Sequence, residues 1–309
     1  MILCVTPNPA VDRTLVVPHL QLDGVNRAVE CRTAAGGKGV NVARAAQTLG
    51  ETVLCMGFVG GVQGALFEEL AHRDGLYARW TRIGGETRAC TILLDPEAGH
   101  NTVINEQGPP TTEADWLRFR DDTRAAASGA AAACICGSAP PGSPISGYAA
   151  LVASLHAVGL PVWVDVSGAP LAAVRLLAGV HLKINRDEAS ALLHQPLERL
   201  EDVLAAADAL RREGQRSVII TRAAGGAVLA SDRGRWHARP PAIKRNNAVG
   251  SGDSFLAGLL AALVRGEDEA TALAWGTAAG AANAAAAGGA AFSRSQFDTA
   301  LEGVTVERG

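Results

Sequence analysis

The stretch AVGSGDS at residues 248–254 combines two glycines, small neighbours and one carboxylate. Apolar residues follow it with the offset of one helix face, at Phe255, Leu256, Leu259, Leu260, Leu263 and Val264. This pattern predicts that Gly250, Ser251 and Gly252 begin a helix, where unpaired backbone N–H groups and the helix dipole attract phosphate. The carboxylate of Asp253 would then face a hydroxyl group, and the stretch predicts phosphoryl transfer.

The same stretch has a structural alternative, a glycine-rich turn that begins a core helix with Ser251 or Asp253 as its cap. It is not one of the commoner phosphate-binding motifs. The chain contains no G-x-x-x-x-G-K-[ST], and Phe255 stands where a dinucleotide-binding sequence needs its third glycine. The choice between a catalytic site and a helix cap therefore depends on the rest of the chain.

Composition narrows the class of protein. The chain has 309 residues and a formal net charge of −3, and we expect one large α/β unit over residues 1–309 with a small appendage. Its Lys and Arg residues are scattered, which argues against nucleic acid as a partner. Its six cysteines show no C-x-x-C spacing, which predicts free thiols in a reducing cytoplasm. The sequence predicts neither a signal peptide nor a membrane span.

Short apolar runs alternate with helical patterns along most of the chain, as at 52–59 and then 63–74. This alternation predicts βαβ units and a mostly parallel sheet. Three stretches read as strands with no helix between them, at 13–18, 26–33 and 88–105. We expect these to form a small antiparallel sheet that stands off the main one as a lid.

Polar residues gather at the carboxyl ends of the predicted strands, where open α/β sheets bind their ligands. They are Asn8, Asp12, residues 36–41, residues 137–138, Asp165, residues 183–185 and Thr221. Residues 36–39, Gly-Gly-Lys-Gly, also begin a predicted helix and offer close backbone approach beside one cation. A flexible loop that leads into a helix is the alternative for this segment.

Two signatures make the chain resemble the PfkB (ribokinase-like) carbohydrate kinases: AAGGKGVNVARAAQTLG at 34–50 and NNAVGSGDSFLAG at 246–258. Within that family it is similar to the phosphosugar branch that contains 1-phosphofructokinase and tagatose-6-phosphate kinase. The supporting stretches are TPNPAVD at 6–12, LDGVNR at 22–27, GETR at 85–88, NEQGP at 105–109, CGSAPPG at 136–142, VDVSG at 164–168 and KINRDE at 183–188. The resemblance implies a three-layer αβα fold with a mostly parallel central sheet and a small β-sheet lid.

The resemblance also implies a role for each matching residue on the sugar side. Asp253 matches the general base, and the anion hole beside it is formed by Gly250, Ser251 and Gly252. The positions that contact sugar hydroxyls match Asp12, Gly36, Gly37, Lys38 and Asn41. The positions that hold the phosphate already on the substrate match Arg27, Arg88 and Ser138. A guanidinium suits this task because its forked donors fit two phosphate oxygens.

The alternative for Arg27 and Arg88 is that both are solvated lid residues paired with nearby acids such as Glu86 or Glu106. On the nucleotide side, the resemblance implies that ATP is contacted by Lys183, Asn185, Thr221, Gly226 and Asn283. Asn185 and Glu188 match the family's N-x-x-E pair, which would help to place Mg²⁺ through water.

Two of the nucleotide-side assignments have a structural alternative. For Asn185 and Glu188 it is an ordinary helix start, and for Asn283 it is packing within an alanine-rich helix. Ala223 stands where the family has the first glycine of its phosphate loop, so the backbone of that loop is expected to shift.

Three ketohexose monophosphates fit the pattern: fructose 1-phosphate, which we favour, tagatose 6-phosphate and fructose 6-phosphate. A furanose ring with CH₂O groups at both ends can present either end to Asp253. A ribokinase-like or nucleoside kinase and a sugar-phosphate sensor without turnover are the competing functions. We also expect a homodimer joined through the lids, because a projecting sheet has a bare edge and an apolar face to cover.

Overall fold

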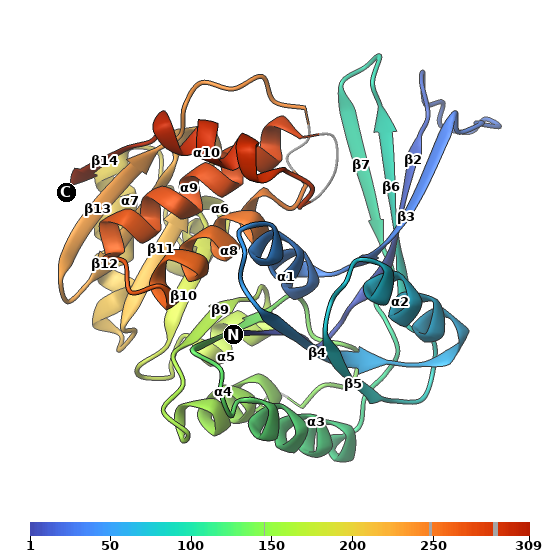
Figure 1. Cartoon of the computed structure of the whole chain (residues 1–309), viewed down its shortest axis with the longest axis horizontal. Coiled ribbons are helices and arrows are strands. Elements are labelled where there is room, and N and C mark those ends of the chain that lie inside the picture. The colour runs from blue at the N-terminus through green and yellow to red at the C-terminus, as the bar shows by residue number, and fades with distance from the viewer. Residues whose placement is uncertain (145, 247–248, 287–289) are drawn as a thin grey trace.

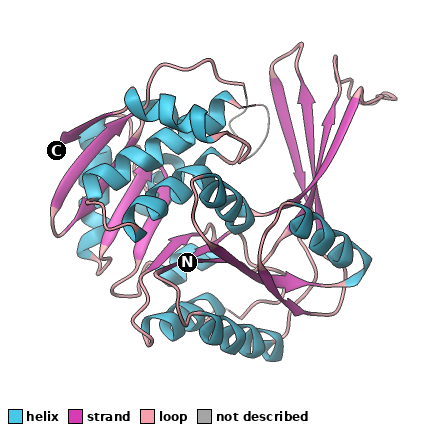
Figure 2. Ribbon diagram, viewed as in Figure 1, coloured by secondary structure: helices cyan, strands magenta, loops and turns pink. Residues whose placement is uncertain are grey.

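A ten-stranded sheet in the order β14-β13-β12-β11-β10-β9-β8-β1-β4-β5 runs through the molecule (Figures 1 and 2). The computed structural model describes residues 1–144, 146–246, 249–286 and 290–309. The strands of this sheet are β1 (Ile2–Thr6), β4 (Val53–Val59), β5 (Ala78–Arg82), β8 (Ala132–Cys136), β9 (Val162–Asp165), β10 (His181–Asn185), β11 (Ser217–Thr221), β12 (Ala227–Ser231), β13 (Gly234–Arg239) and β14 (Thr305–Arg308). Neighbours from β5 to β11 pair in parallel, and β12 to β14 extend the sheet with antiparallel pairs.

Helices cover both faces of this sheet, which gives the expected three layers. One face packs against α1 (Lys38–Thr48), α2 (Gly61–Arg73), α8 (Ser251–Val264), α9 (Glu269–Ala285) and α10 (Arg294–Glu302). The other face packs against α3 (Glu113–Ala126), α4 (Gly147–His156), α5 (Ala169–Val174), α6 (Arg186–Leu193) and α7 (Leu200–Arg212). Strands such as β1 and β8 are buried along their whole length. Their continuous apolar sequences follow from burial on both faces.

A second, four-stranded sheet in the order β3-β2-β6-β7 projects from the body of the molecule (Figure 1). Its strands are β2 (Ala10–Val16), β3 (Glu30–Gly36), β6 (Arg88–Asp95) and β7 (His100–Asn105). The sheet predicted from the sequence therefore exists.

Its predicted boundaries and pairing need correction. The first strand covers 10–16 rather than 13–18, and the second covers 30–36 rather than 26–33. Both extend to the base of the lid because Ala10 pairs with Gly36 there. The stretch 88–105 is a hairpin of two strands rather than one.

The lid sheet is also mixed rather than antiparallel, since β2 and β6 pair in parallel. Both strands run outward from the body and lie at the middle of the sheet, while β3 and β7 return on either side of them. Two outgoing strands that are neighbours must run in the same direction.

Among the described residues, no helix combines the length and the hydropathy needed to cross a bilayer.

Candidate active site

The start of α8 has the form expected from the glycine-rich stretch. Gly250 precedes the helix in the left-handed conformation, with φ of 79°, which a side chain would disfavour. The first backbone bond of the helix runs from Ser254 N to Gly250 O at 2.8 Å. The N–H groups of Ser251 and Gly252 therefore precede the helical hydrogen bonds and are available to an anion. Residues 247 and 248 of the signature lie outside the described part of the chain.

Asp253 is buried in the first turn of α8 and accepts a hydrogen bond from Asn41 Nδ2 at 2.8 Å. Burial raises the pKa of its carboxyl group, and the nearby charge of Asp165 raises it further. Lys38, Lys183 and the bond from Asn41 act in the opposite direction. A carboxylate with a raised pKa is a stronger base than a solvated one, as proton abstraction from a hydroxyl requires.

An ion cluster of Asp165, Lys38 and Lys183 lies next to this turn. Asp165, at the end of β9, accepts bonds from Lys38 Nζ at 2.8 Å and from Lys183 Nζ at 2.5 Å. Although burial alone would raise the pKa of Asp165, the two lysines hold it below the usual value. A Cβ atom on Gly252 would lie 2.9 Å from Lys183 Nζ, so this ammonium group sits directly against the helix start. Positive charge is thus concentrated where α8 offers its free amides.

Asp12 lies on β2, where the lid joins the body. A Cβ atom on Gly36 would come within 2.1 Å of its carboxylate carbon, so only glycine fits beside the Asp12 side chain. Burial raises the pKa of Asp12 to about 6, against the attraction of Arg88 and Arg44. Asp253 contributes to the same increase in pKa, which places the two carboxylates in one electrostatic environment.

Arg88 and Ser138 meet at the base of the lid around the buried side chain of Asn8. Arg88 donates to the carbonyl of Asn8 from Nε at 3.2 Å and from Nη2 at 3.0 Å, and to the carbonyl of Glu106 from Nη1 at 3.0 Å. Asn8 in turn donates to Ser138 Oγ at 3.2 Å. The predicted phosphate contacts Arg88 and Ser138 are therefore brought together.

The alternative pairing of these arginines with acids is not observed. Glu86 accepts from the backbone N–H groups of Val62 and Gln63 at the start of α2, and Glu106 accepts from Ala89 N. Arg27 lies in the exposed segment before β3 rather than within a strand. It forms no hydrogen bond or ion pair with the described residues.

The Asn185 and Glu188 pair forms a reciprocal cap at the start of α6. Asn185 Oδ1 accepts from Glu188 N at 2.8 Å, and Glu188 Oε2 accepts from Asn185 N at 2.9 Å. This is the ordinary helix start named above as the alternative. The negative charge of Glu188 still helps to raise the pKa of Lys38, so the Glu188 carboxylate lies near the ion cluster. Among the described residues, no group of three or more His, Cys, Asp or Glu side chains is arranged to hold a metal.

The loop after β11 keeps the conformation expected of glycine, although one glycine is replaced. Thr221 ends the strand, and Ala223 begins a 3-10 turn (Ala223–Gly225) with φ of 49° in the left-handed region. Ala223 thus adopts a strained conformation that favours glycine, and a shift of the loop backbone relative to the family stays a prediction. Gly226 follows in a position where a Cβ atom would meet the carbonyl oxygen of Ala238 at 1.9 Å.

Asn283, buried on α9, is attached to the glycine-rich turn. Its Nδ2 donates to Val249 O and to Ser251 Oγ, both at 2.9 Å. Both hydrogens of its amide are thereby used at the start of α8. The role of Asn283 in an adenine pocket remains a prediction.

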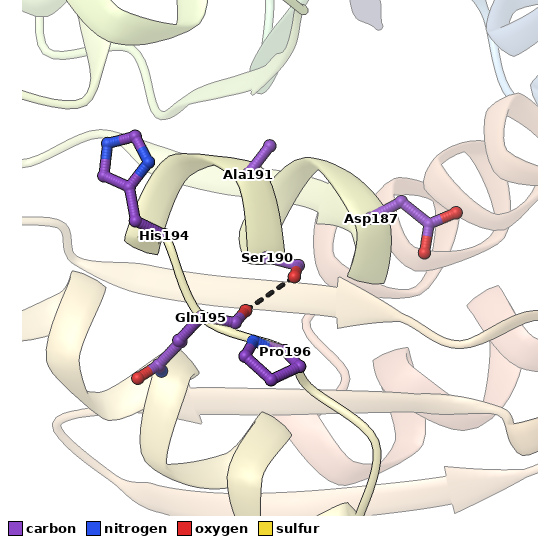
Figure 3. Close-up of a pocket in the computed structure, with 6 residues that line it drawn as sticks. All are labelled: Asp187, Ser190, Ala191, His194, Gln195 and Pro196. Atoms are coloured by element: carbon purple, nitrogen blue, oxygen red, sulfur yellow. Dashed lines mark hydrogen bonds between the residues drawn. The ribbon is translucent and has the colours of Figure 1, made fainter.

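A shallow depression lies along α6. It is lined by Asp187, Ser190, Ala191, His194, Gln195 and Pro196 (Figure 3). Ser190 Oγ donates to Gln195 O at 2.5 Å, and His194 ends the helix in the left-handed conformation. These bonds close a helix terminus, and the depression contains no part of the predicted site.

Asn8 and Asp165 lie at the rim, as the sequence predicts, but their partners do not follow from it. Arg44 is a residue of the site that the sequence analysis does not predict. Arg44 follows Asn41 by three positions on α1 and donates to its Oδ1 from Nη1 at 3.1 Å. The i, i+3 spacing on a predicted helix was the available signal.

Comparison with known proteins identifies the family. The model of the pfkB family carbohydrate kinases matches residues 6–295. The chain belongs to this family. It is therefore an ATP-dependent phosphotransferase that acts on a carbohydrate. A curated 1-phosphofructokinase of Xanthomonas campestris pv. campestris is 34% identical over 275 residues, which cover 88% of this chain and 86% of the relative.

Solved structures of pfkB kinases and their relatives show the same fold. A Thermotoga maritima protein described as a possible 1-phosphofructokinase superposes with a TM-score of 0.91 at 24% identity, covering 100% of this chain and 99% of that one. Phosphofructokinase-2 of Escherichia coli in complex with potassium gives 0.90 at 23% identity, with 98% of each chain covered. Arabidopsis thaliana ribokinase complexed with ribose and ATP gives 0.79 at 22% identity, with 97% and 98% covered. The ribokinase-like fold expected from the sequence is confirmed.

Proposed function

We propose that this pfkB kinase transfers the γ-phosphoryl group of ATP to a ketohexose monophosphate and that fructose 1-phosphate is its preferred acceptor. The observation that carries the proposal is the geometry of the α8 start, where a buried carboxylate, Asp253, lies beside free amides and a lysine. The identity of 34% to a curated 1-phosphofructokinase favours fructose 1-phosphate over tagatose 6-phosphate and fructose 6-phosphate. The whole chain would act as one kinase unit with the lid as its appendage.

The proposed reaction begins at Asp253. Its Oδ2 accepts from Asn41, so Oδ1 remains for the acceptor hydroxyl of the sugar. As the hydroxyl oxygen bonds to the γ-phosphorus, its proton passes to Asp253, and the bond to the β,γ-bridging oxygen breaks to release ADP. The amides of Ser251 and Gly252, with Lys183 beside them, would stabilise the charge on the transferred group. Lys38 belongs to the same ion cluster and would act on the same charge.

The nucleotide would lie toward the ends of β10 and β11, at Lys183, Asn185, Thr221 and Gly226. Magnesium, when bound, would neutralise part of the charge on the phosphate groups of ATP. Glu188 has one oxygen that accepts from no described residue, and it fits a Mg²⁺ ion held through water, since Mg²⁺ retains much of its hydration. Both oxygens of Asp165 already accept from lysines, so Asp165 fits this role less well.

The substrate's own phosphate would be held by Arg27, Arg88 and Ser138. A guanidinium has five N–H donors, so Arg88 keeps donors beyond those used on Asn8 and Glu106. Ser138 Oγ accepts from Asn8 and keeps its own hydrogen to donate. Arg27 lies in the exposed loop at the outer end of β2 and β3, whereas Arg88 and Ser138 lie at the base of the lid, so it would reach this phosphate only through movement of the lid or from a second copy of the chain.

We propose a homodimer joined through the lids. The lid exposes large apolar side chains, among them Leu22 at 92%, Val25 at 85% and Ile104 at 55%. A second copy of the same surface would cover them by symmetry. Free cysteines, five of them buried, are consistent with a reducing cytoplasm. Light scattering at micromolar concentration tests the dimer, and a fully active monomer would contradict it.

A coupled ADP-release assay tests the substrate. The panel is fructose 1-phosphate, tagatose 6-phosphate, fructose 6-phosphate, fructose and ribose, with the product identified by NMR. We expect the highest kcat/KM for fructose 1-phosphate. A preference for either 6-phosphate would move the assignment within the family, and equal or better use of fructose or ribose would refute a phosphosugar kinase.

A further inference from the structure

We propose that Arg44 is a positioning residue for the general base: it fixes the side-chain amide of Asn41 so that Asn41 donates to one oxygen of Asp253 and leaves the other for the acceptor hydroxyl. The inference rests on the proposed role of Asp253 and adds a residue that contacts no reacting atom. Arg44 and Asn41 lie one helical turn apart on α1, and Asp253 faces them from α8.

The orientation of the Asn41 amide follows from the chemistry of its two neighbours. Arg44 Nη1 donates to Asn41 Oδ1 at 3.1 Å, and a guanidinium can only donate. The oxygen of the amide must therefore face Arg44, and its NH₂ group must face Asp253, where the distance to Oδ2 is 2.8 Å. With Arg44 absent, only an ionised Asp253 would hold the amide in this orientation, and the amide could turn over whenever Asp253 is protonated.

Arg44 is itself held by two further residues. Its Nη2 donates to the carbonyl of Ala35 at 2.7 Å and to Asp74 Oδ2 at 2.6 Å, and its Nε donates to the same Asp74 oxygen at 3.1 Å. Ala35 lies at the end of β3, and Asp74 caps the C-terminus of α2. The guanidinium therefore connects the lid strand β3 and the end of α2 to Asn41, which contacts Asp253 on α8.

The rival interpretation is that Arg44 only fastens α1 to α2. A second link between these elements offers a matched control, because Gln47 Nε2 donates to Gly75 O at 2.9 Å and does not contact Asn41. The Gln47→Ala variant breaks this hydrogen bond between α1 and the end of α2 and leaves the Arg44 contacts in place. If fastening were the whole role, Gln47→Ala and Arg44→Gln would change turnover alike.

The experiment compares the parent enzyme with Arg44→Lys, Arg44→Gln, Gln47→Ala, Asn41→Ala and the double variant Arg44→Gln/Asn41→Ala. We expect Arg44→Gln to lower kcat by roughly 10- to 100-fold, the usual consequence of misplacing a reacting group by about 1 Å. The KM for ATP and the kcat of Gln47→Ala should stay near the parent values. Arg44→Gln should add little to Asn41→Ala, since both remove the same contact.

The pH dependence separates geometry from charge. The charged groups near Asp253 are Asp12, Asp165, Lys38 and Lys183, and they remain in every variant. The bond from Asn41 lowers the pKa of Asp253. Its loss should therefore raise this pKa and move the acid limb of kcat/KM to higher pH. Arg44→Lys keeps the charge but lacks the fork that reaches Asn41, Ala35 and Asp74 together, so it should move the limb in the same direction as Arg44→Gln.

The outcomes that overturn the inference are distinct from those that overturn the function. Additive losses in the double variant, or an equal loss in Gln47→Ala, would refute a positioning role for Arg44. If the parent phosphorylates no sugar phosphate, the proposed function fails instead. The inference is then decided by carboxyl ¹³C NMR, which should show a higher pKa for Asp253 in Arg44→Gln than in the parent. An unchanged pKa of Asp253 would refute it without any turnover measurement.

Discussion

The central sheet and the lid sheet are made of similar strands, but they are covered differently. Every residue of β1 and β8 is buried, whereas every residue of β7 and most of β3 are exposed. Groups fixed on the buried sheet and on α8, such as Asp165 and Asp253, are held by packing and by charged partners. The lid lacks such packing in a single chain. Reaction chemistry should therefore depend on the body, and substrate selection should depend on the lid.

The most severe test of the body is Asp253→Asn. We expect kcat to fall by about 10²- to 10⁴-fold, which is the usual worth of a general base, while the fold and sugar binding persist. Turnover is measured by ADP release and binding by isothermal titration. A variant with near-parent kcat would show that Asp253 is only a helix cap, as the sequence alone also allowed.

The matching test of the lid is Arg27→Ala and Arg88→Ala. Each charge-assisted contact with phosphate contributes about 1.5–3 kcal/mol, so each variant should raise the KM for the phosphosugar by roughly 10- to 100-fold and leave the KM for ATP nearly unchanged. Arg32→Ala is the control, because Arg32 is an exposed lid arginine paired with Glu30. A similar increase in all three variants would indicate general weakening of the lid.

The junction of the two regions is tested by Asp12→Asn. Burial raises the pKa of Asp12 from 3.8 to about 6, so the folded state holds a proton that the unfolded state has already lost. The free energy of unfolding of the parent should fall as the pH rises from about 4 to about 6. The variant side chain cannot ionise, so the free energy of unfolding of the variant should exceed that of the parent by about 1–2 kcal/mol at neutral pH. This is less than the full pKa shift would give, because partial solvent access weakens the effect of burial. Urea unfolding at pH 4 and pH 7.5 measures it, and an equal difference at both pH values would contradict the shift.

The weakest effect is expected in the body at Ala223→Gly. Alanine in the left-handed conformation is strained, and glycine removes that strain but adds freedom to the unfolded chain. The net gain in stability should be at most about 1 kcal/mol. Thermal unfolding checks this change, and ATP titration compares the affinities. A loss of stability would show that the loop does not need the left-handed conformation.

Motif order was enough to predict the fold and the family. The glycine-rich stretch identified the start of α8, and the alternation of apolar runs with helical patterns identified the parallel sheet, because both depend on neighbours in sequence. The lid was predicted with shifted ends, since strand ends depend on pairing across the sheet. The pairing of Ala10 with Gly36 extends both strands inward, and no local signal reports it.

Sequence by itself settled which residue types reach the rim of the sheet and which chemistry they serve, because a strand end, a helix start and a carboxylate are local features. Tertiary structure alone decided which partners these groups have. It placed Asp165 between two lysines, turned the Asn41 amide toward Asp253, and occupied Arg88 with the carbonyls of Asn8 and Glu106. Such partners lie up to 212 positions apart in the chain, and burial rather than sequence spacing sets their distances and pKa values.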